Sequence, residues 1–228
     1  MDTSGSHVDW AVALATLLLA IVALWQDRIW RWWDRPKLEV STLTSPPVCV
    51  MMPVTNAIDG SFLGMSVYLR VMVKNIGRSS AKNVEVFAAS LVRKLPDGKC
   101  EYVSAFPSMN LRWANAHDGN LPWLSPDMVR FCDVCHVFDP KRRALVGEES
   151  EILKLTDNQA SLAFNVQFAP NNKGHIVGPG TYALHVLVGA ENCRPVRQDI
   201  EVWLDGSWTN DQAEMLRQHV RIKLSPTP

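Results

Sequence analysis

Apolar residues follow two different patterns along the chain, and the change falls near residue 36. The first pattern is a continuous run, because the sixteen residues from Trp10 to Trp25 carry no charge. As a helix this run is roughly 24 Å long, shorter than the ~30 Å hydrocarbon core of a bilayer. The tryptophans and arginines that flank it add length and suit the membrane interface. The predicted interface residues are Trp10, Trp25, Arg28, Trp30, Arg31, Trp32, Trp33 and Arg35.

A retained transmembrane helix with a juxtamembrane collar is therefore predicted over residues 10–35. A cleaved signal peptide is one alternative, but it needs a positively charged leader and a small-residue cleavage site. The leader of this chain carries Asp2 and Asp9 but no Lys or Arg, and the run ends in Trp-Gln-Asp-Arg. A buried helix of a globular domain is the other alternative. Five tryptophans among the first 33 residues favour an interface anchor over it.

The cations beside this helix predict its orientation. Arg28, Arg31, Arg35 and Lys37 all lie on its C-terminal side. An excess of cations marks the cytoplasmic flank, so residues 1–9 are expected outside the cell and residues 36–228 in the cytoplasm. The expected location is the cell inner membrane, crossed once. An odd number of cysteines without a disulfide spacing agrees with a reducing compartment: Cys49, Cys100, Cys132, Cys135 and Cys193.

Small residues form a stripe along the same helix. Ala13, Thr16, Ala20 and Ala23 are spaced three, four and three residues apart, so they share one face. Such a face lets two membrane helices approach closely, which makes self-association one hypothesis. The other is that alanine is simply common in membrane helices.

Beyond residue 36, apolar residues recur at every second position, which is typical of half-buried strands. In the clearest case, Met65 to Lys74, one face carries Val67, Leu69, Val71 and Val73. The same alternation predicts strands over residues 37–44, 81–91, 128–138, 161–168, 182–188, 198–204 and 219–224.

A short helix is predicted near the C-terminus. The run from Thr209 to Gln212 is similar to a capping box, and the helix is expected to continue through Leu216. Seven to nine short strands with turns between them predict two antiparallel sheets packed as a β-sandwich. The expected fold of residues 36–228 is therefore mainly β, preceded by one transmembrane α-helix.

Two segments resemble bacterial immunoglobulin-like domains, among them the cell-adhesion-related domain of bacteria. From Val73 to Val86 the chain matches the hairpin V-x-N-x-G-x-x-x-A-x-x-V-x-V, and from Pro179 to Val186 it matches P-G-x-Y-x-L-x-V. The resemblance covers about half of residues 36–228, and the region from Phe106 to Phe138 departs from it. It implies an immunoglobulin-like β-sandwich and hardly restricts the function. The whole arrangement is also similar to uncharacterised single-pass proteins of bacteria.

Charge and motif content exclude several classes of function. With 23 basic and 23 acidic residues, the chain has no net charge and no basic footprint for nucleic acid. It contains no Gly-x-Ser-x-Gly, no His-Glu-x-x-His and no glycine-rich phosphate loop. We therefore expect no enzyme activity and no cofactor. Two groups of acidic residues resemble carboxylate pairs and are expected to be solvated: Asp133 with Asp139, and Glu148 with Glu149 and Glu151.

The segment Cys132-x-x-Cys135-His136 matches the pattern of covalent haem attachment. Haem is attached outside the cytoplasm, on a turn that leads into a helix, whereas these residues lie in a predicted cytoplasmic strand. A strand places Cys132 and His136 on one face and Cys135 on the other, so the three converge on a metal only if the strand bends. Core or half-buried thiols are expected, and a redox, metal or haem role is the open alternative.

Two tryptophans form a candidate partner surface. Trp203 lies on the opposite face of its strand from Val202 and Leu204, so a partner or the bilayer can cover it. The alternative is that Trp208 and the short helix cover Trp203 within the chain.

These observations lead to one expectation of function. The chain is expected to be a non-catalytic binding or assembly module at the membrane: an accessory subunit, a scaffold or a sensor. Its expected partners are the lipid bilayer and either a membrane protein or a second copy of the chain, and not nucleic acid.

Overall fold

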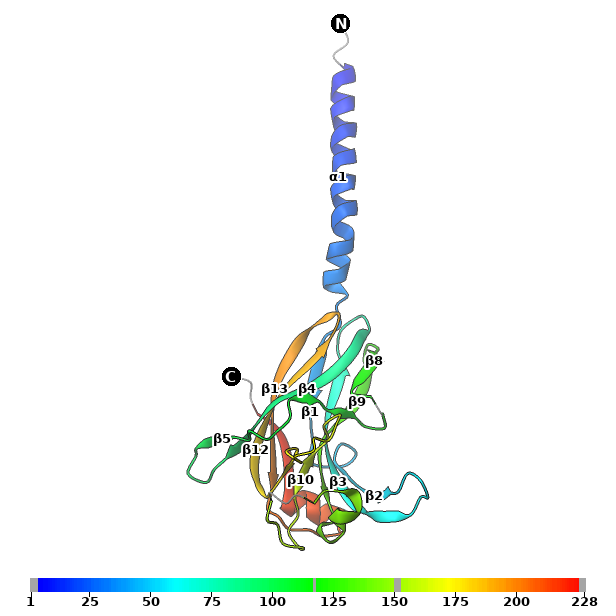
Figure 1. The fold of residues 1–228 in the computed structure, drawn as a ribbon. Coiled ribbons are helices and arrows are strands. Elements are labelled where there is room, and N and C mark those ends of the chain that lie inside the picture. The colour runs from blue at the N-terminus through cyan, green and yellow to red at the C-terminus, as the bar shows by residue number, and fades with distance from the viewer. Residues whose placement is uncertain (1–3, 117, 150–152, 226–228) are drawn as a thin grey trace.

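A long helix projects from a domain built of β-strands (Figure 1). The computed structural model describes residues 4–116, 118–149 and 153–225, and within the helix it describes side chains only for residues 10–23 and 25. The helix, α1, spans Ser4–Trp33. Every side chain described in it is exposed. Within the described side chains, no helix combines the length and the apolar character that a membrane span requires.

The β domain consists of two antiparallel sheets, as predicted. The first sheet has the order β1-β3-β9-β10-β11, with β2 beside β3 and β7 beside β9. These strands span Leu38–Ser41 (β1), Val50–Thr55 (β2), Phe62–Asn75 (β3), Arg112–Trp113 (β7), Val129–Phe138 (β9), Leu162–Phe164 (β10) and Ile176–Val177 (β11).

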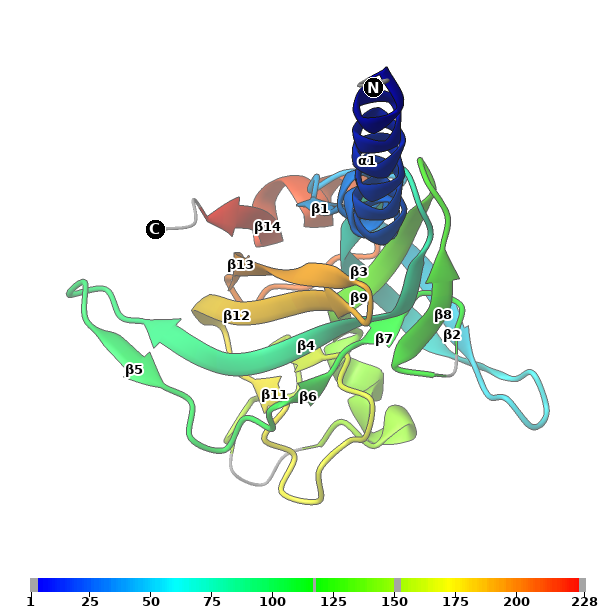
Figure 2. The ribbon, with the colours of Figure 1, turned by 90° about the horizontal axis from the view of Figure 1, so that it is seen from above.

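The second sheet has the order β14-β13-β12-β4-β5, with β6 and β8 paired to β4. Its strands span Ala81–Lys94 (β4), Cys100–Tyr102 (β5), Met109–Asn110 (β6), Asn120–Leu124 (β8), Gly180–Ala190 (β12), Cys193–Leu204 (β13) and Val220–Ser225 (β14). Seen along α1, the second sheet lies beside the first, with its long strands β12, β13 and β4 stacked next to β3 and β9 (Figure 2).

The core lies between the inward faces of the two sheets. Val67, Leu69, Val71 and Val73 of β3 are fully buried, as their alternation predicts. The inward residues of β12 and β13 belong to the same buried cluster. Burying apolar area on both sheets is the main force that holds the domain together.

Two strands of the structure differ from the sequence-based prediction. The strand predicted over 161–168 is only β10, Leu162–Phe164, and beyond it Val166 makes one isolated bridge to Leu111. Strand β2 escaped prediction because its sequence lacks alternation and contains Pro53, which a strand paired on one side tolerates.

The predicted C-terminal helix exists, but its cap is a different residue. Helix α2 spans Gln212–Glu214 and continues as a π-helical turn, η2, over Met215–His219. Its N-cap is Asp211, whose carboxylate accepts from the N–H groups of Ala213 and Glu214 at 2.8 and 3.1 Å. The hydroxyl of Thr209 instead accepts from the N–H of Asp211. The carboxylate lies closer to the free N–H groups of the first turn, so it takes the capping position.

The exit from α1 is fixed to the β domain by one buried amide, that of Asn75. Its Oδ1 accepts from the N–H groups of Lys37 at 3.2 Å and Gly77 at 3.0 Å. Its Nδ2 donates to the carbonyls of Ser79 at 2.7 Å and Leu124 at 2.9 Å. Asn75 is fully buried, and its amide therefore joins three chain segments: the helix exit, the β3–β4 turn and the end of β8.

The same junction leaves no room for a side chain at Gly77. A Cβ at this position would lie 2.4 Å from the backbone N of Lys37 and 2.6 Å from Cα of Pro36. The N–H of Ile76 also donates to the carbonyl of Lys37 at 2.8 Å, and the Ser79 hydroxyl donates to the carbonyl of Asp34. The chain thus passes from α1 into β1 (via residues 34–37) in close contact with the domain.

Replacing Asn75 should destabilise the domain. In Asn75→Ala, four backbone groups lose a buried partner, and each such loss costs about 1–3 kcal/mol when water does not replace it. We expect the free energy of unfolding in urea to fall by about 3 kcal/mol. The control is Asn171→Ala at an exposed position, which should change it by no more than about 0.5 kcal/mol. Equal effects of the two substitutions would contradict the assigned role of Asn75.

Candidate functional site

The predicted membrane-interface residues divide into two groups. Trp10 and Trp25 are 74% and 57% exposed on α1, and Arg35 is exposed at its exit. The side chains of Arg28, Trp30, Arg31, Trp32 and Trp33 lie outside the described residues, although their backbone belongs to α1. Their contact with a membrane remains a prediction.

The small-residue stripe is exposed along α1. Ala13, Thr16, Ala20 and Ala23 are all accessible. The Thr16 hydroxyl donates to the carbonyl of Val12 at 2.8 Å, so its polar group is satisfied within the helix and does not prevent close packing. Self-association through this stripe also stays a prediction.

The Cys132-x-x-Cys135-His136 segment lies in the middle of β9, and a bulge changes which side chains share a face. Cys135 pairs with Leu69, but Asp133 pairs with Arg70, so Val134 is an extra residue in β9. Both cysteines therefore face the core opposite Leu69 and Val71, while Asp133 and His136 face outward. The prediction that Cys132 and His136 share one face was wrong, because strict period two fails at a bulge.

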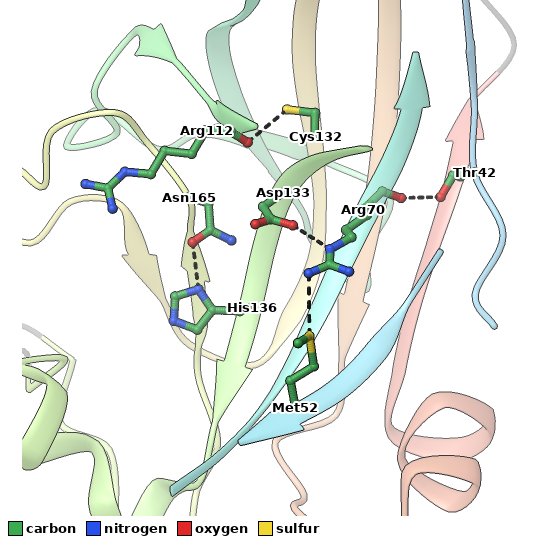
Figure 3. A network of polar contacts seen from close by, with 8 residues as sticks. All are labelled: Thr42, Met52, Arg70, Arg112, Cys132, Asp133, His136 and Asn165. Atoms are coloured by element: carbon green, nitrogen blue, oxygen red, sulfur yellow. Dashed lines mark hydrogen bonds and ion pairs between the residues drawn. The ribbon is translucent and has the colours of Figure 1, made fainter. Parts of the chain in front are cut away.

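The two thiols lie in a dry, apolar environment. Cys132 and Cys135 are fully buried, and burial together with the nearby Asp133 charge raises the pKa of each thiol well above its ordinary value. The Cys132 thiol donates to a backbone acceptor, the carbonyl of Arg112, at 3.4 Å (Figure 3). Among the described residues, no group of three His, Cys, Asp or Glu side chains can hold a metal ion. The residues of the motif do not converge on a ligand.

The outward face of the same strands carries a polar network that joins β3 to β9 (Figure 3). The Arg70 Nε donates to Asp133 Oδ1 at 2.5 Å, with both side chains largely shielded from water. The Arg70 guanidinium also lies over the Tyr68 ring, 5.3 Å from its centroid. Burial raises the pKa of Asp133, although the Arg70 charge and hydrogen bond oppose this. The expectation that Asp133 is solvated was wrong.

His136 sits beside this pair and has a partner on each ring nitrogen. Its Nδ1 lies 2.9 Å from Asn165 Oδ1, and its Nε2 lies 2.5 Å from Glu148 Oε1. Burial lowers the pKa of His136, but the charge and hydrogen bond of Glu148 and the acceptor of Asn165 outweigh it and raise the pKa. Two acceptors suit an imidazolium, which donates from both nitrogens. Glu148 was also expected to be solvated, but it is the largely buried partner of His136, and the two form an ion pair when the imidazole is protonated.

A cavity of about 330 Å³ opens beside this network. Two of its lining residues, Trp113 and Asn165, each have a buried N–H group for which the described structure offers no acceptor. Asp133, Tyr68 and Arg112 line the same cavity. Figure 3 shows the second carboxylate oxygen of Asp133 directed toward the Asn165 amide. Unpaired buried donors are costly, so this cavity suits a water or a small molecule with acceptor oxygens.

A larger hollow of about 470 Å³ lies at another place on the domain. It lies between the β4–β5 hairpin and the segment before β12, and its lining includes Arg93, Tyr102, Lys173 and Tyr182. The Tyr182 hydroxyl already donates to the carbonyl of Gly178 at 3.0 Å. The buried His175 lies between two residues that line this hollow, Gly174 and Ile176. Its Nδ1 has no partner among the described residues, and burial lowers its pKa.

The two tryptophans of the candidate partner surface each have contacts within the chain. Trp203 of β13 pairs with Arg221 of β14, whose guanidinium lies 5.6 Å from the centroid of the Trp203 ring. Trp208 instead packs partly against the core and donates from Nε1 to Asn210 Oδ1 at 3.2 Å. The Arg221 side chain of the next strand thus lies over the Trp203 ring. A partner at Trp203 and Trp208 stays a prediction.

The interaction between His136 and Glu148 should make the stability of the domain depend on pH. A raised histidine pKa gives stability that is present below the ordinary value of 6.5 and is lost as the pH rises through the folded pKa. In Glu148→Gln the charge that most raises the pKa of His136 is lost, so this pKa should fall. The expected result, from urea unfolding at a series of pH values, is a smaller loss of stability as the pH rises through the folded pKa of His136. The exposed Glu149→Gln serves as control and should retain the original slope, and an unchanged slope in Glu148→Gln would refute the pairing.

The exposed Cys100 should react faster with thiol reagents than the two cysteines of the Cys-x-x-Cys-His segment. Cys100 is exposed, whereas Cys132 and Cys135 are buried with raised pKa values. Because the thiolate is the reactive form, a maleimide should modify Cys100 first in the folded chain. Cys100→Ser should remove this fast reaction. A fast reaction that survives in Cys100→Ser but disappears in Cys135→Ser would instead reveal a reactive motif.

Comparison with known proteins gives no indication of function for this chain. No protein-family model matches the chain, and no curated protein is detectably similar to it in sequence.

Proposed function

We propose that this chain is a non-catalytic binding or assembly module, held at a membrane by α1 as a single-pass anchor. The observation that carries this proposal is the exposure of apolar side chains on every side of α1. From Trp10 to Ala23 all described side chains are exposed, and the seven large aliphatic residues among them are each at least 44% exposed. These are Val12, Leu14, Leu17, Leu18, Leu19, Ile21 and Val22.

A bilayer is the environment that fits this helix best. A helix that is apolar all round is stable only when lipid or protein surrounds it. Uncharged residues extend from Trp10 to Trp25, and a tryptophan at each end suits the two interfaces. Because the cations flank the C-terminal side of the helix, the β domain then lies in the cytoplasm and the N-terminus outside. The small-residue stripe is a face through which a second copy or another membrane protein can pack.

The β domain is proposed to be an immunoglobulin-like sandwich. The turn that carries Asn75, Gly77 and Ala81 is not the hairpin that the sequence predicts, because β3 and β4 belong to different sheets. A connection that crosses between two sheets still suits a sandwich, and Tyr182 of the second motif supports the proposal as well. The Tyr182 hydroxyl donates to a carbonyl four residues upstream, which resembles the tyrosine corner of immunoglobulin-like domains.

Binding is favoured over redox or metal chemistry because of how the polar groups are arranged. Both thiols of the Cys-x-x-Cys-His segment lie in the core, on the opposite side of the sheet from His136. The charged groups of the outward face are paired, Arg70 with Asp133 and His136 with Glu148. Paired charges beside a small cavity are suited to holding a ligand in place rather than to transferring electrons.

The anchor can be tested by flotation of the full chain with phospholipid vesicles after alkaline carbonate extraction. We expect the chain to float with the lipid. Leu18→Arg combined with Ile21→Arg should abolish this, because each arginine at the centre of a bilayer costs about 2.5–3.5 kcal/mol. The control is Leu43→Arg with Leu145→Arg, two leucines that are equally exposed on the β domain. If the control pair also prevents flotation, or the α1 pair does not, the anchor is wrong.

The exposed Cys100 reports the orientation of the inserted chain. A maleimide that does not cross membranes should label it in inside-out vesicles of the inner membrane and not in intact cells, with Cys100→Ser as the blank. Labelling of intact cells would place the β domain outside and would overturn the proposed orientation.

A further inference from the structure

Three turns of the β domain meet where α1 joins it (Figure 1). They are the β3–β4 turn (residues 76–80), the β8–β9 turn (residues 125–128) and the β12–β13 turn (residues 191–192). The Asn75 amide ties the first turn to the end of β8. Asn192 ties the first turn to the third, because its Oδ1 accepts from the N–H of Lys82 at 3.0 Å and its Nδ2 donates to the carbonyl of Ser80 at 2.9 Å. We call these turns and their flanking residues the helix-proximal end.

Large apolar side chains are exposed at this end. Trp123 of β8 is 67% exposed, and its strand pairs it with Lys82. Ile76, Met128 and Val129 are each at least 40% exposed. Ile76 follows Asn75 directly and is hydrogen-bonded through its backbone to Lys37, so it lies next to the exit of the helix. An exposed tryptophan with aliphatic neighbours is typical of a surface that contacts a partner or a lipid interface.

Cations outnumber acids around these side chains. The exposed or half-exposed cations are Lys37, Lys74, Arg78, Lys82, Arg130 and Arg194. The acids are Asp34, Glu39, Asp127 and Glu191. Two of the acids already have partners, since Asp127 lies 3.5 Å from Lys74 and Glu191 accepts from the Asn83 amide at 2.5 Å. The helix-proximal end is therefore net positive, in a chain whose total charge is zero.

We propose that the helix-proximal end is a lipid-docking surface, which rests on the headgroups of an anionic bilayer. This proposal builds on the membrane anchor proposed above. Trp123, Ile76 and Met128 would enter the interface, where amphipathic and apolar side chains are stable. Arg78 and Lys82 would lie near the phosphates, and each cation close to an anionic surface strengthens binding about fivefold.

The close junction with α1 favours lipid over a protein as the occupant. The β3–β4 turn touches the chain at Pro36 and Lys37, directly after the helix, so there is no length of free chain to hold it away from the bilayer. A surface continuous with an inserted helix meets headgroups before it meets any other partner. Mixed apolar and cationic side chains match those headgroups, whereas the core of a protein interface is depleted of charge.

The test places an environment-sensitive fluorophore at each end of the domain in the full chain. Cys100→Ser and Cys193→Ser remove the accessible thiols, and a single cysteine is then introduced as Trp123→Cys or, for comparison, Tyr102→Cys. Both positions are highly exposed, 67% and 73%, but Tyr102 of β5 lies far from α1 (Figure 1). We expect the label at 123 to shift to the blue in vesicles that contain phosphatidylserine, less in phosphatidylcholine alone, and the label at 102 to shift in neither.

Charge reversal provides the matched control. Arg78→Glu with Lys82→Glu should reduce the shift at 123 and make it insensitive to salt, whereas Lys99→Glu with Lys141→Glu, exposed cations elsewhere on the domain, should leave it unchanged. Equal responses at 102 and 123 would overturn the lipid-docking surface, whether or not the chain resists carbonate extraction. A shift at 123 that needs added protein rather than anionic lipid would overturn it as well. Failure of extraction resistance alone would count against the anchor and not against this surface.

Discussion

The buried amide of Asn75 is the interaction on which the arrangement of the molecule depends. It has two acceptor sites and two donors, and all four are used. No apolar residue can replace such a group, because the backbone groups that it satisfies come from three separate segments. The amide also sits at the end of β3, the strand that pairs with β1, β2 and β9. One side chain thus connects the long helix to the centre of the first sheet.

The outward face of the first sheet holds charged side chains that are paired and largely shielded from water. Arg70 and Asp133 lie opposite each other on β3 and β9, so their ion pair needs no additional ordering of the backbone. Glu148 is different, because it comes from the segment after helix η1 (Pro140–Val146) and is brought to His136 from outside the sheet. The cavity beside them is bounded by donors whose acceptors must come from water or a ligand.

The sequence was a good guide where one physical rule dominated. Period-two alternation identified the long strands, since burial on one face forces it, and it placed Val67 to Val73 in the core as found. It was a poor guide where a single residue breaks the period. The polar face of β3, with Tyr68 and Arg70, was visible in the alternation, but its partners on β9 were not, because the bulge at Val134 leaves no signature in the pattern. Asn165 and Glu148 come from irregular segments, and only the tertiary fold brings them together.

The absence of a free linker between α1 and β1 has a mechanical consequence. A domain joined by a flexible linker moves independently of its tether, but here residues 34–37 are bonded to the turn beneath them. These contacts couple the tilt of α1 to the orientation of the β domain. A change in the tilt of α1 therefore also displaces the β4–β5 hairpin, which projects from the side of the domain (Figure 1).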